Sequence, residues 1–162
     1  MVCLTGSTTK KVVVRRFERE PLQGFVSPQS YLRPDGMELL TPAGAVVLVQ
    51  YQELKSICFV RDWVDDQPES KVFLTRPKMD GLWVRMHFRD GEVMDGILSN
   101  NLLQWEAYGF TVVPPEPNSN NQKIFLPRQA LLEMQVLGVV GSPLTRRRKR
   151  PVAKEQIGLF EE

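Results

Sequence analysis

The chain has 162 residues, of which 42% are hydrophobic and 25% are charged, as is usual for a soluble globular protein. The longest purely apolar run, Ala45–Val49, has five residues. A membrane-spanning helix needs about 20, so none is expected. The segment Met1–Gly6 has neither a basic region nor an apolar core, so we expect no secretion signal and a cytoplasmic location.

The formal net charge of +2 is unevenly distributed. Residues 142–162 hold six basic and three acidic side chains, a charge of +3, which leaves 15 basic and 16 acidic side chains and −1 for the rest. A nearly neutral body argues against a broad nucleic-acid-binding face. Cys3 and Cys58 are too few for a disulfide framework and fit a reducing cytosol.

Strand-like segments occur along the chain in two copies of the same order and spacing. The first copy contains Val12–Phe17, Leu22–Phe25, Gly36–Leu40, Val47–Val49 and Leu54–Val60. The second contains Trp83–Phe88, Met94–Ile97, Gly109–Val113, Ile124–Leu126 and Leu131–Leu137. Val49 and Leu54 are five positions apart, and so are Leu126 and Leu131. This matched spacing indicates an internal duplication of a small all-β unit.

Local signals within the copies favour strands and tight turns. The β-branched run Lys11–Phe17 predicts a strand, and Val84–Phe88 alternates apolar and polar residues as a half-buried strand does. The segment Arg89–Glu92 contains the Asp-Gly pair of a tight hairpin. Gly24 and Gly96 fall inside strands, where a glycine permits the bend that a small barrel needs.

We therefore predict an all-β fold of two tandem five-stranded small barrels packed together. The expected parts are a first barrel at 10–62, a linker at 63–81, a second barrel at 82–140 and a disordered basic tail at 141–162. Within these parts we expect a short strand at Lys71–Thr75 and single helical turns at Tyr51–Leu54 and Pro127–Leu131.

No pattern in the sequence indicates catalysis. His87 is the only histidine, and the two cysteines lie far from it in sequence, so no zinc-ligand spacing exists. Neither a phosphate-binding glycine loop nor a nucleophile elbow occurs. We expect no catalytic residue, no metal and no cofactor, and a protein that is not an enzyme.

Two groups of side chains allow both a binding and a structural interpretation. The first group, basic residues around the first strand, contains Lys10, Lys11, Arg15, Arg16 and Arg19. It could contact nucleic-acid phosphates, or it could protect an edge strand against aggregation. The second group, large aromatic residues, contains Tyr31, Trp83, Trp105, Tyr108 and Phe110. It could stack on bases, or it could fill the core and the contact between the barrels.

The C-terminal segment carries two linear features. A cationic run, which would attract DNA weakly and salt-dependently, consists of Arg146, Arg147, Arg148, Lys149 and Arg150. The run Gln156-Ile157-Gly-Leu159-Phe160 then resembles the bacterial sliding-clamp-binding motif, which has Gln, an aliphatic residue, a variable residue, Leu and Phe. This resemblance implies that Gln156, Ile157, Leu159 and Phe160 bind the clamp. The alternative is an apolar tail that folds back onto the body.

Three further resemblances concern the body. The repeat unit around Phe88–Gly91 and Gly96 resembles Sm-like small barrels, but Ser99–Leu102 and Leu126–Gln129 stand where the Sm RNA-binding signatures would be. Uridine-tract binding is therefore not implied. Arg15 and Arg19 have the Arg-x-x-x-Arg spacing of PilZ cyclic-di-GMP receptors, whose second motif is missing.

Most of the chain, residues 8–142, resembles a family of uncharacterised bacterial proteins that is common in Acidobacteria. The resemblance rests on Cys58–Asp62, Arg76–Val84 and Ser119–Asn121. It implies no known activity. Our leading hypothesis is a cytoplasmic adaptor tethered to the sliding clamp by its tail, with weak nonspecific DNA attraction. The alternatives are a nucleic-acid-binding small-barrel protein and a PilZ-like ligand sensor.

Overall fold

The computed structural model describes residues 8–63, 71–115 and 120–141. These residues form eleven β-strands and two short 3-10 helices, so the expectation of an all-β fold is confirmed. Within the described ranges, no helix is long and apolar enough to cross a membrane. We call residues 8–63 the first half and residues 71–141 the second half.

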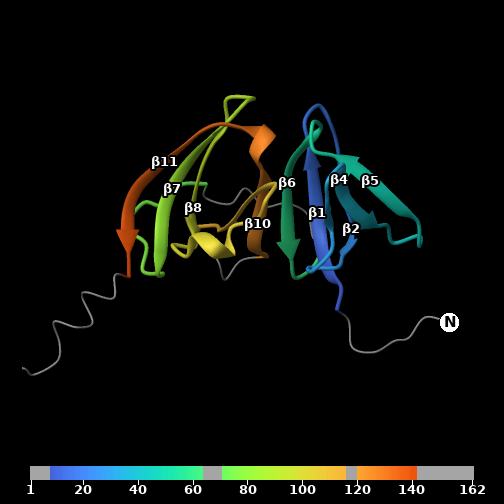
Figure 1. Cartoon of the computed structure of the whole chain (residues 1–162), viewed down its shortest axis with the longest axis horizontal. Coiled ribbons are helices and arrows are strands. Elements are labelled where there is room, and N and C mark those ends of the chain that lie inside the picture. Colours follow the sequence, from blue (N-terminus) through green and yellow to red (C-terminus); the bar gives the residue numbers. More distant parts are fainter. Residues whose placement is uncertain (1–7, 64–70, 116–119, 142–162) are drawn as a thin grey trace, which may run out of the picture.

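The secondary-structure elements follow the duplicated segments of the sequence (Figure 1). The first half contains β1 (Lys10–Arg16), β2 (Arg19–Val26), β3 (Leu32–Arg33), β4 (Gly36–Leu40), β5 (Val46–Gln50) and β6 (Leu54–Val60). The second half contains β7 (Gly81–Phe88), β8 (Val93–Leu98), η1 (Leu102–Gln104), β9 (Gly109–Val113), β10 (Asn121–Pro127), η2 (Arg128–Ala130) and β11 (Leu131–Val140).

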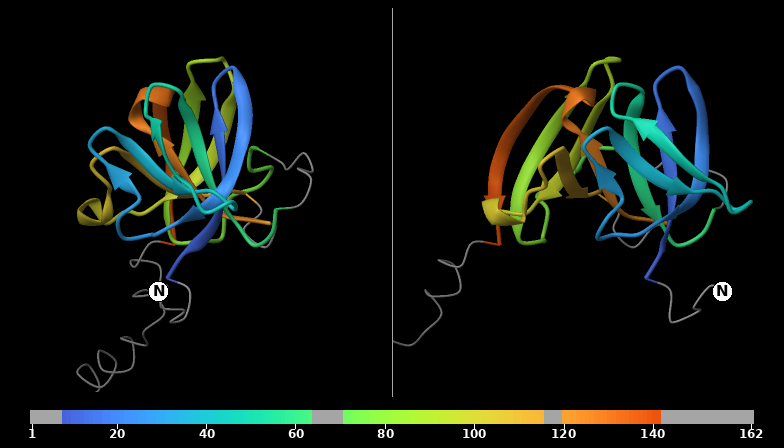
Figure 2. Two further views of the ribbon diagram at one scale, coloured as in Figure 1. Left: turned by 90° about the vertical axis from the view of Figure 1, so that its right-hand side faces the viewer. Right: turned by 45° about the vertical axis from the view of Figure 1, so that its right-hand side comes forward.

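The strands form one continuous antiparallel sheet in the order β11-β7-β8-β9-β10-β6-β1-β2-β4-β3, and β5 pairs with β4 along its whole length, Gly36–Leu40. When the short β3 is left out, the strand order is the same in both halves. It is β6-β1-β2-β4-β5 in the first half and β11-β7-β8-β9-β10 in the second, so the last strand of each half pairs with its first strand. The halves are joined where β10 pairs with β6 (Figures 1 and 2). We call this β6–β10 contact the seam.

The pairing register supports the duplication residue by residue. Gly24 lies opposite Val12 in the β1–β2 pair, and Gly96 lies opposite Val84 in the β7–β8 pair. Both glycines are needed for close packing. A Cβ atom on Gly24 would lie 2.5 Å from the Leu40 carbonyl oxygen, and one on Gly96 would lie 2.9 Å from the Val112 side chain.

The last strands of the two halves also share an irregularity. Leu54 of β6 lies opposite Arg16, and Leu131 of β11 lies opposite Phe88. In both pairs the register shifts immediately after the leucine. The sequence alignment of Leu54 with Leu131 is therefore reproduced in the strand pairing, together with its β-bulge.

The seam is buried on both of its faces. Ile57 and Phe59 of β6 belong to the core of the first half, whereas Cys58 and Val60 belong to the core of the second. Phe125 of β10 packs into the first core although it belongs to the second half. A strand between two cores has no solvated face, which explains why residues 57–60 form a continuous apolar run.

Several local predictions differ from the structure. Lys71–Thr75 is not a strand; its backbone is instead bonded to β8, where Asp95 N donates to Lys71 O at 2.6 Å. The helical turn expected at Pro127–Leu131 is present as η2, but the turn at Tyr51–Glu53 is not helical.

The turns at the ends of the first strands also differ between the halves. The expected Asp-Gly turn is present in the second half, where Gly91 has a φ of 91°. The first half has no glycine at its turn, and Glu18 adopts a left-handed φ of 58° instead. Beyond Gly141, the predicted disordered tail lies outside the described residues, and so do the cationic run and Gln156–Phe160.

Candidate ligand groove at the seam

A groove of about 710 Å³ lies beside the seam, where the first turns of the two halves approach each other. It combines side chains of opposite charge with one aromatic ring. Its lining residues are Arg16, Phe17, Glu18, Arg19, Gln52, Glu53, Lys55, Arg89 and Asp90. Because the turns of both halves contribute, the groove depends on how the halves are joined.

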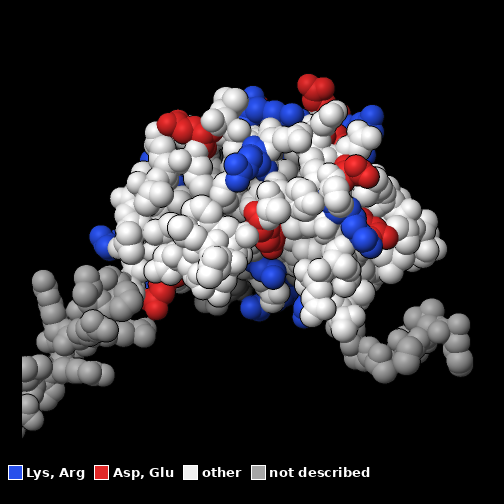
Figure 3. All heavy atoms as spheres, in the orientation of Figure 1, with Lys and Arg blue, Asp and Glu red and all other residues white. Residues whose placement is uncertain are grey.

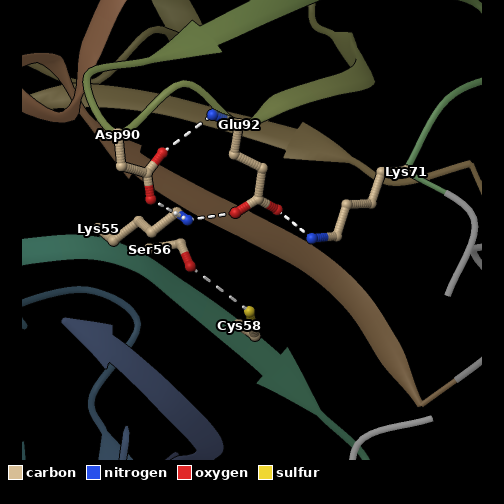
Figure 4. A network of polar contacts seen from close by, with 6 residues as sticks. All are labelled: Lys55, Ser56, Cys58, Lys71, Asp90 and Glu92. Atoms are coloured by element: carbon tan, nitrogen blue, oxygen red, sulfur yellow. Dashed lines mark hydrogen bonds and ion pairs between the residues drawn. The ribbon is translucent and has the colours of Figure 1, made fainter. Parts of the chain in front are cut away.

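Lys55 is the central charged group of this region (Figure 4). Its ammonium group comes from β6 and lies 2.6 Å from an Asp90 carboxylate oxygen, and it also pairs with Glu92. Glu92 binds Lys71 as well, and its backbone N–H donates to Asp90 at 3.1 Å. Two cations and two anions therefore neutralise each other, and the pairs that Lys55 makes with Asp90 and Glu92 connect the two halves.

The pKa values of these groups follow from this arrangement. Burial alone would lower the pKa of Lys55, but the hydrogen bonds and charges of Asp90 and Glu92 outweigh it and raise that pKa above its usual value. Burial opposes ionisation of Asp90 and Glu92, yet the hydrogen bonds from Lys55 lower the pKa of both carboxyls. All three stay charged near neutrality, so this network is suited to fastening the halves rather than to proton transfer.

The arginines of the groove are also engaged. The Arg89 guanidinium lies 4.0 Å above the ring of Phe17 and donates to the backbone oxygen of Gln52. Arg19 lies 3.4 Å from a Glu53 carboxylate oxygen. The Arg89 contacts connect the second half to the first, and the Arg19–Glu53 pair connects two turns of the first half. The groove therefore contains both positive and negative side chains.

A second polar centre, which the sequence did not reveal, surrounds Asp95 of β8. This side chain is fully buried, and its oxygens accept bonds from Arg85 Nε at 2.7 Å and Arg85 Nη2 at 3.1 Å. Phe73 N and Trp83 Nε1 also donate to it, at 3.2 and 3.4 Å. Asp95 thus ties the segment that enters the second half to its sheet. The available signal was an aspartate within the apolar strand Val93–Leu98.

A third cluster lies at the seam and contains tyrosines from both halves. Tyr51 stacks on Tyr108 with ring centroids 5.3 Å apart, and Tyr31 packs edge-on against Phe125. Burial, with the nearby Tyr108 and Glu106 charges, raises the pKa of Tyr51 to about 12. Two of the five aromatic residues singled out in the sequence, Tyr31 and Tyr108, therefore pack between the halves.

Glu106 is the carboxylate beside these tyrosines. Its Oε1 accepts from Thr111 Oγ1 at 3.1 Å, whereas its buried Oε2 has no hydrogen-bond partner among the described residues. Burial raises the pKa of Glu106, against the weaker opposing effects of Thr111 and Lys123. This group is the one carboxyl of the described chain whose pKa is raised.

The basic residues of β1 do not protect a sheet edge. β1 lies between β2 and β6, so that interpretation is wrong. Lys11 lies 3.5 Å from Asp62 and 5.4 Å above the ring of Trp63, and Arg16 donates to the Glu20 carbonyl oxygen. On the face shown in Figure 3, acidic and basic side chains are interspersed and most of the surface is uncharged.

The remaining candidate residues lie apart from the groove. His87 of β7 is half-buried and lies opposite Glu133 of β11. Trp83 contacts Phe73, and Trp105 contacts Phe110, so neither ring adds to the tyrosine cluster. The described part of the chain has no group of three His, Cys, Asp or Glu residues that could hold a metal ion.

These features define an all-β protein in which two similarly connected halves share a polar and aromatic seam. The chain belongs to a family of unknown function (DUF6982), which matches residues 8–138. Comparison with curated proteins found no match, and comparison with solved structures found none.

Proposed function

We propose that the protein is a non-enzymatic cytoplasmic adaptor that binds the DNA sliding clamp through its C-terminal segment. The proposal rests on one observation, the run Gln156-Ile157-Gly-Leu159-Phe160. Leu159 and Phe160 would be paired apolar anchors, and the Gln156 amide would fix the register of the bound peptide. The cationic run Arg146–Arg150 would add weak nonspecific attraction to DNA.

The position of β11 supports this proposal. β11 is an end strand of the sheet and ends at Val140, away from the seam (Figure 1). Sixteen positions separate Val140 from Gln156, a span of about 50 Å if extended. The motif could therefore reach a partner without contact between that partner and the seam.

For the body we propose two Sm-like small barrels that share one sheet. The supporting observation is the strand order, in which the last strand of each half pairs with the first and is followed by the second, third and fourth. The close approach at Gly24 and Gly96 is also what strongly curved sheets require. The internally neutralised network around Lys55 favours a structural body over a catalytic one.

The test is a titration of the full-length protein and of a labelled peptide of residues 150–162 into a purified bacterial sliding clamp. We expect saturable binding of roughly micromolar affinity, because ordering a flexible peptide weakens it. Replacing both Leu159 and Phe160 by Ala should abolish binding. In the full-length protein, Leu144→Ala is the matched control, since it removes an apolar tail residue outside the motif.

Two results would contradict the proposal. One is an absence of saturable binding below about a millimolar. The other is equal weakening by Leu144→Ala and by the double replacement, which would indicate general stickiness of the tail. Neutralising Arg146–Arg150 should leave clamp affinity nearly unchanged and weaken association only with clamp loaded on DNA at low salt.

A second candidate function is nucleic-acid binding at the groove, favoured by the presence of Arg16, Arg19 and Arg89 in one depression. Arg16→Glu with Arg19→Glu should then abolish a salt-sensitive affinity for single-stranded DNA or RNA, whereas loss of the tail should not. Cyclic-di-GMP, titrated into the wild type and into Arg15→Glu with Arg19→Glu, tests the PilZ-like alternative suggested by Arg15 and Arg19.

A further inference from the structure

Inside the molecule, the sheet pairs a strand of the second half, β10, with a strand of the first half, β6, and it leaves the counterparts of these two strands at its ends. At the seam, β10 is the fourth strand of the second half and β6 is the last strand of the first. Their counterparts are β5, which is the fourth strand of the first half when the short β3 is left out, and β11, the last strand of the second. In the described ranges, neither β5 nor β11 has a strand on its outer edge.

Two glycines establish the equivalence of β5 and β10. Gly36 begins β4, and a Cβ atom there would lie 2.2 Å from the carbonyl oxygen of Val49 in β5. Gly109 begins β9, and a Cβ atom there would lie 2.1 Å from the carbonyl oxygen of Leu126 in β10. The same close approach at the same place aligns Val49 with Leu126, and therefore aligns the residues that precede them.

The aligned residues are buried in β10, which has a neighbouring strand, and more exposed in β5, which lacks one on that edge in the described part of the chain. Ile124 and Phe125 of β10 are 6% and 0% exposed, because β6 covers them. Their counterparts in β5, Val47 and Leu48, are 36% and 49% exposed. Both positions are apolar in both strands, so β5 has a surface suited to the same contact but lacks the strand that would cover it.

The same contrast holds for the last strands. Phe59 of β6 is 3% exposed, whereas Val136, which has the equivalent place in β11, is 59% exposed. Further exposed apolar side chains of β11 are Leu132, Leu137 and Val139. The two unpaired edges are thus apolar, and Figure 1 shows them at opposite ends of the molecule.

The composition of β5 strengthens the argument. Exposed edge strands usually carry charged residues or proline that prevent pairing with another chain. Val46–Gln50 contains neither. An edge of this composition is suited to pairing, and the chain itself contains the complementary edge in β11.

We propose that copies of this protein associate head to tail, with β5 of one copy adding to β11 of the next as a continuation of the antiparallel sheet. The contact repeats the seam. There, Phe125 lies opposite Ile57 and Lys123 lies opposite Phe59. The equivalent register places Leu48 opposite Met134 of the second copy, and Val46 opposite its Val136.

This association uses two different edges, so it is heterologous and continues until a ring closes or a chain of copies grows. The proposed contact positions of β11 are accessible. Arg76 donates to the carbonyl oxygen of Val139 at 2.8 Å, but Val139 lies three residues beyond the last proposed contact, Val136. The inference does not depend on clamp binding, since neither edge includes the tail.

The test measures the mass of the full-length protein in solution by light scattering after size-exclusion chromatography. We expect the wild type to be larger than a monomer. Leu48→Lys blocks the β5 edge and Val136→Lys blocks the β11 edge, so each variant alone should be monomeric. Mixed together, they should form a 1:1 dimer and nothing larger, because each contributes one intact edge. Leu103→Lys, at a site 95% exposed in η1, should behave as the wild type.

Other outcomes would overturn the proposal. A monomeric wild type at its highest soluble concentration would show that the edges do not pair. Assembly of Leu48→Lys alone would indicate contact between two β11 edges, and assembly of Val136→Lys alone would indicate contact between two β5 edges. Monomers that remain monomers on mixing would show that the two edges are not complementary.

A second measurement keeps the test independent of the folding of the lysine variants. Directly opposed residues of an antiparallel pair have Cα atoms about 4.5–5.5 Å apart, which is within the range that a disulfide spans. Leu48→Cys mixed with Met134→Cys should give a disulfide-linked heterodimer on mild oxidation, in greater yield than Leu103→Cys mixed with Met134→Cys. Equal yields would overturn the proposed register.

Discussion

Asp95 is a buried carboxylate whose contacts predict its contribution to stability. Burial would raise its pKa, but Arg85 and the donors Phe73 N and Trp83 Nε1 outweigh this effect and lower it. Asp95→Asn should lower the free energy of unfolding by about 1.5–3 kcal/mol at neutral pH, because it removes the charge of a buried carboxylate that accepts several hydrogen bonds, although its partner Arg85 is partly exposed. Urea denaturation measures this loss.

The control for Asp95 is Glu38→Gln, the same change of chemical group at the exposed ion pair with Arg33. It should cost less than about 1 kcal/mol. A lowered pKa stabilises the fold above the usual value near 3.8, and this contribution disappears as the pH falls through the folded-state pKa. The difference between wild type and Asp95→Asn should therefore narrow in acid, and a constant difference would contradict the assignment.

Glu106 should have the opposite pH dependence. Because its pKa is raised above the usual value near 4.5, its effect on stability is most favourable in acid and declines as the pH rises through the folded-state pKa. Glu106→Gln keeps an acceptor for Thr111 and removes the buried charge. We expect it to stabilise the protein by about 1 kcal/mol at neutral pH and to have little effect in acid. A destabilised variant at neutral pH would show that Oε2 has a favourable partner.

For single residues, the sequence predicted which positions of the two halves correspond better than it predicted what each side chain contacts. The spacing aligned Gly24 with Gly96, and the register confirms it. The role of Asp95 depends on Arg85, Trp83 and a loop that folds against β8, and strand periodicity contains no information about such contacts. Of the two interpretations of the basic residues of β1, protection of a sheet edge is wrong, because the pairing partners on the two sides of a strand cannot be read from its own sequence.

Among the strands, β8 offers a matched test of close packing. A side chain at Gly96 would overlap Val112 of β9, whereas a Cβ atom on Gly138 of β11 would meet nothing within 4 Å. Gly96→Val should therefore cost a few kcal/mol, roughly 2–4, and Gly138→Val should cost little. Thermal denaturation of the two variants distinguishes these effects. Similar melting temperatures would show that β8 and β9 can separate without cost.

The strands themselves were largely predictable, and their partners were not. The alternation in Val84–Phe88 and the Asp-Gly pair at Asp90 predicted the β7–β8 hairpin, because both signals are local. The pairing of β6 with β10 joins residues more than 60 positions apart. The run Ile57–Val60 fits any strand that is buried on both faces, so the sequence predicts that the two halves pack together but not that β6 and β10 join them in one continuous sheet.

At the scale of the whole molecule, the shared seam predicts cooperative unfolding. Phe125 packs in the first core and Cys58 in the second, so neither half keeps its core without the other. We expect one transition, with coincident urea curves from variants that retain only Trp63 or only Trp105 as the fluorescent reporter, since these residues lie in different halves. Phe125→Ala should lower the free energy of unfolding by about 3–5 kcal/mol, and both tryptophan reporters should show the same loss. Two separate midpoints, or a shift confined to the Trp105 reporter, would show that the halves are independent domains.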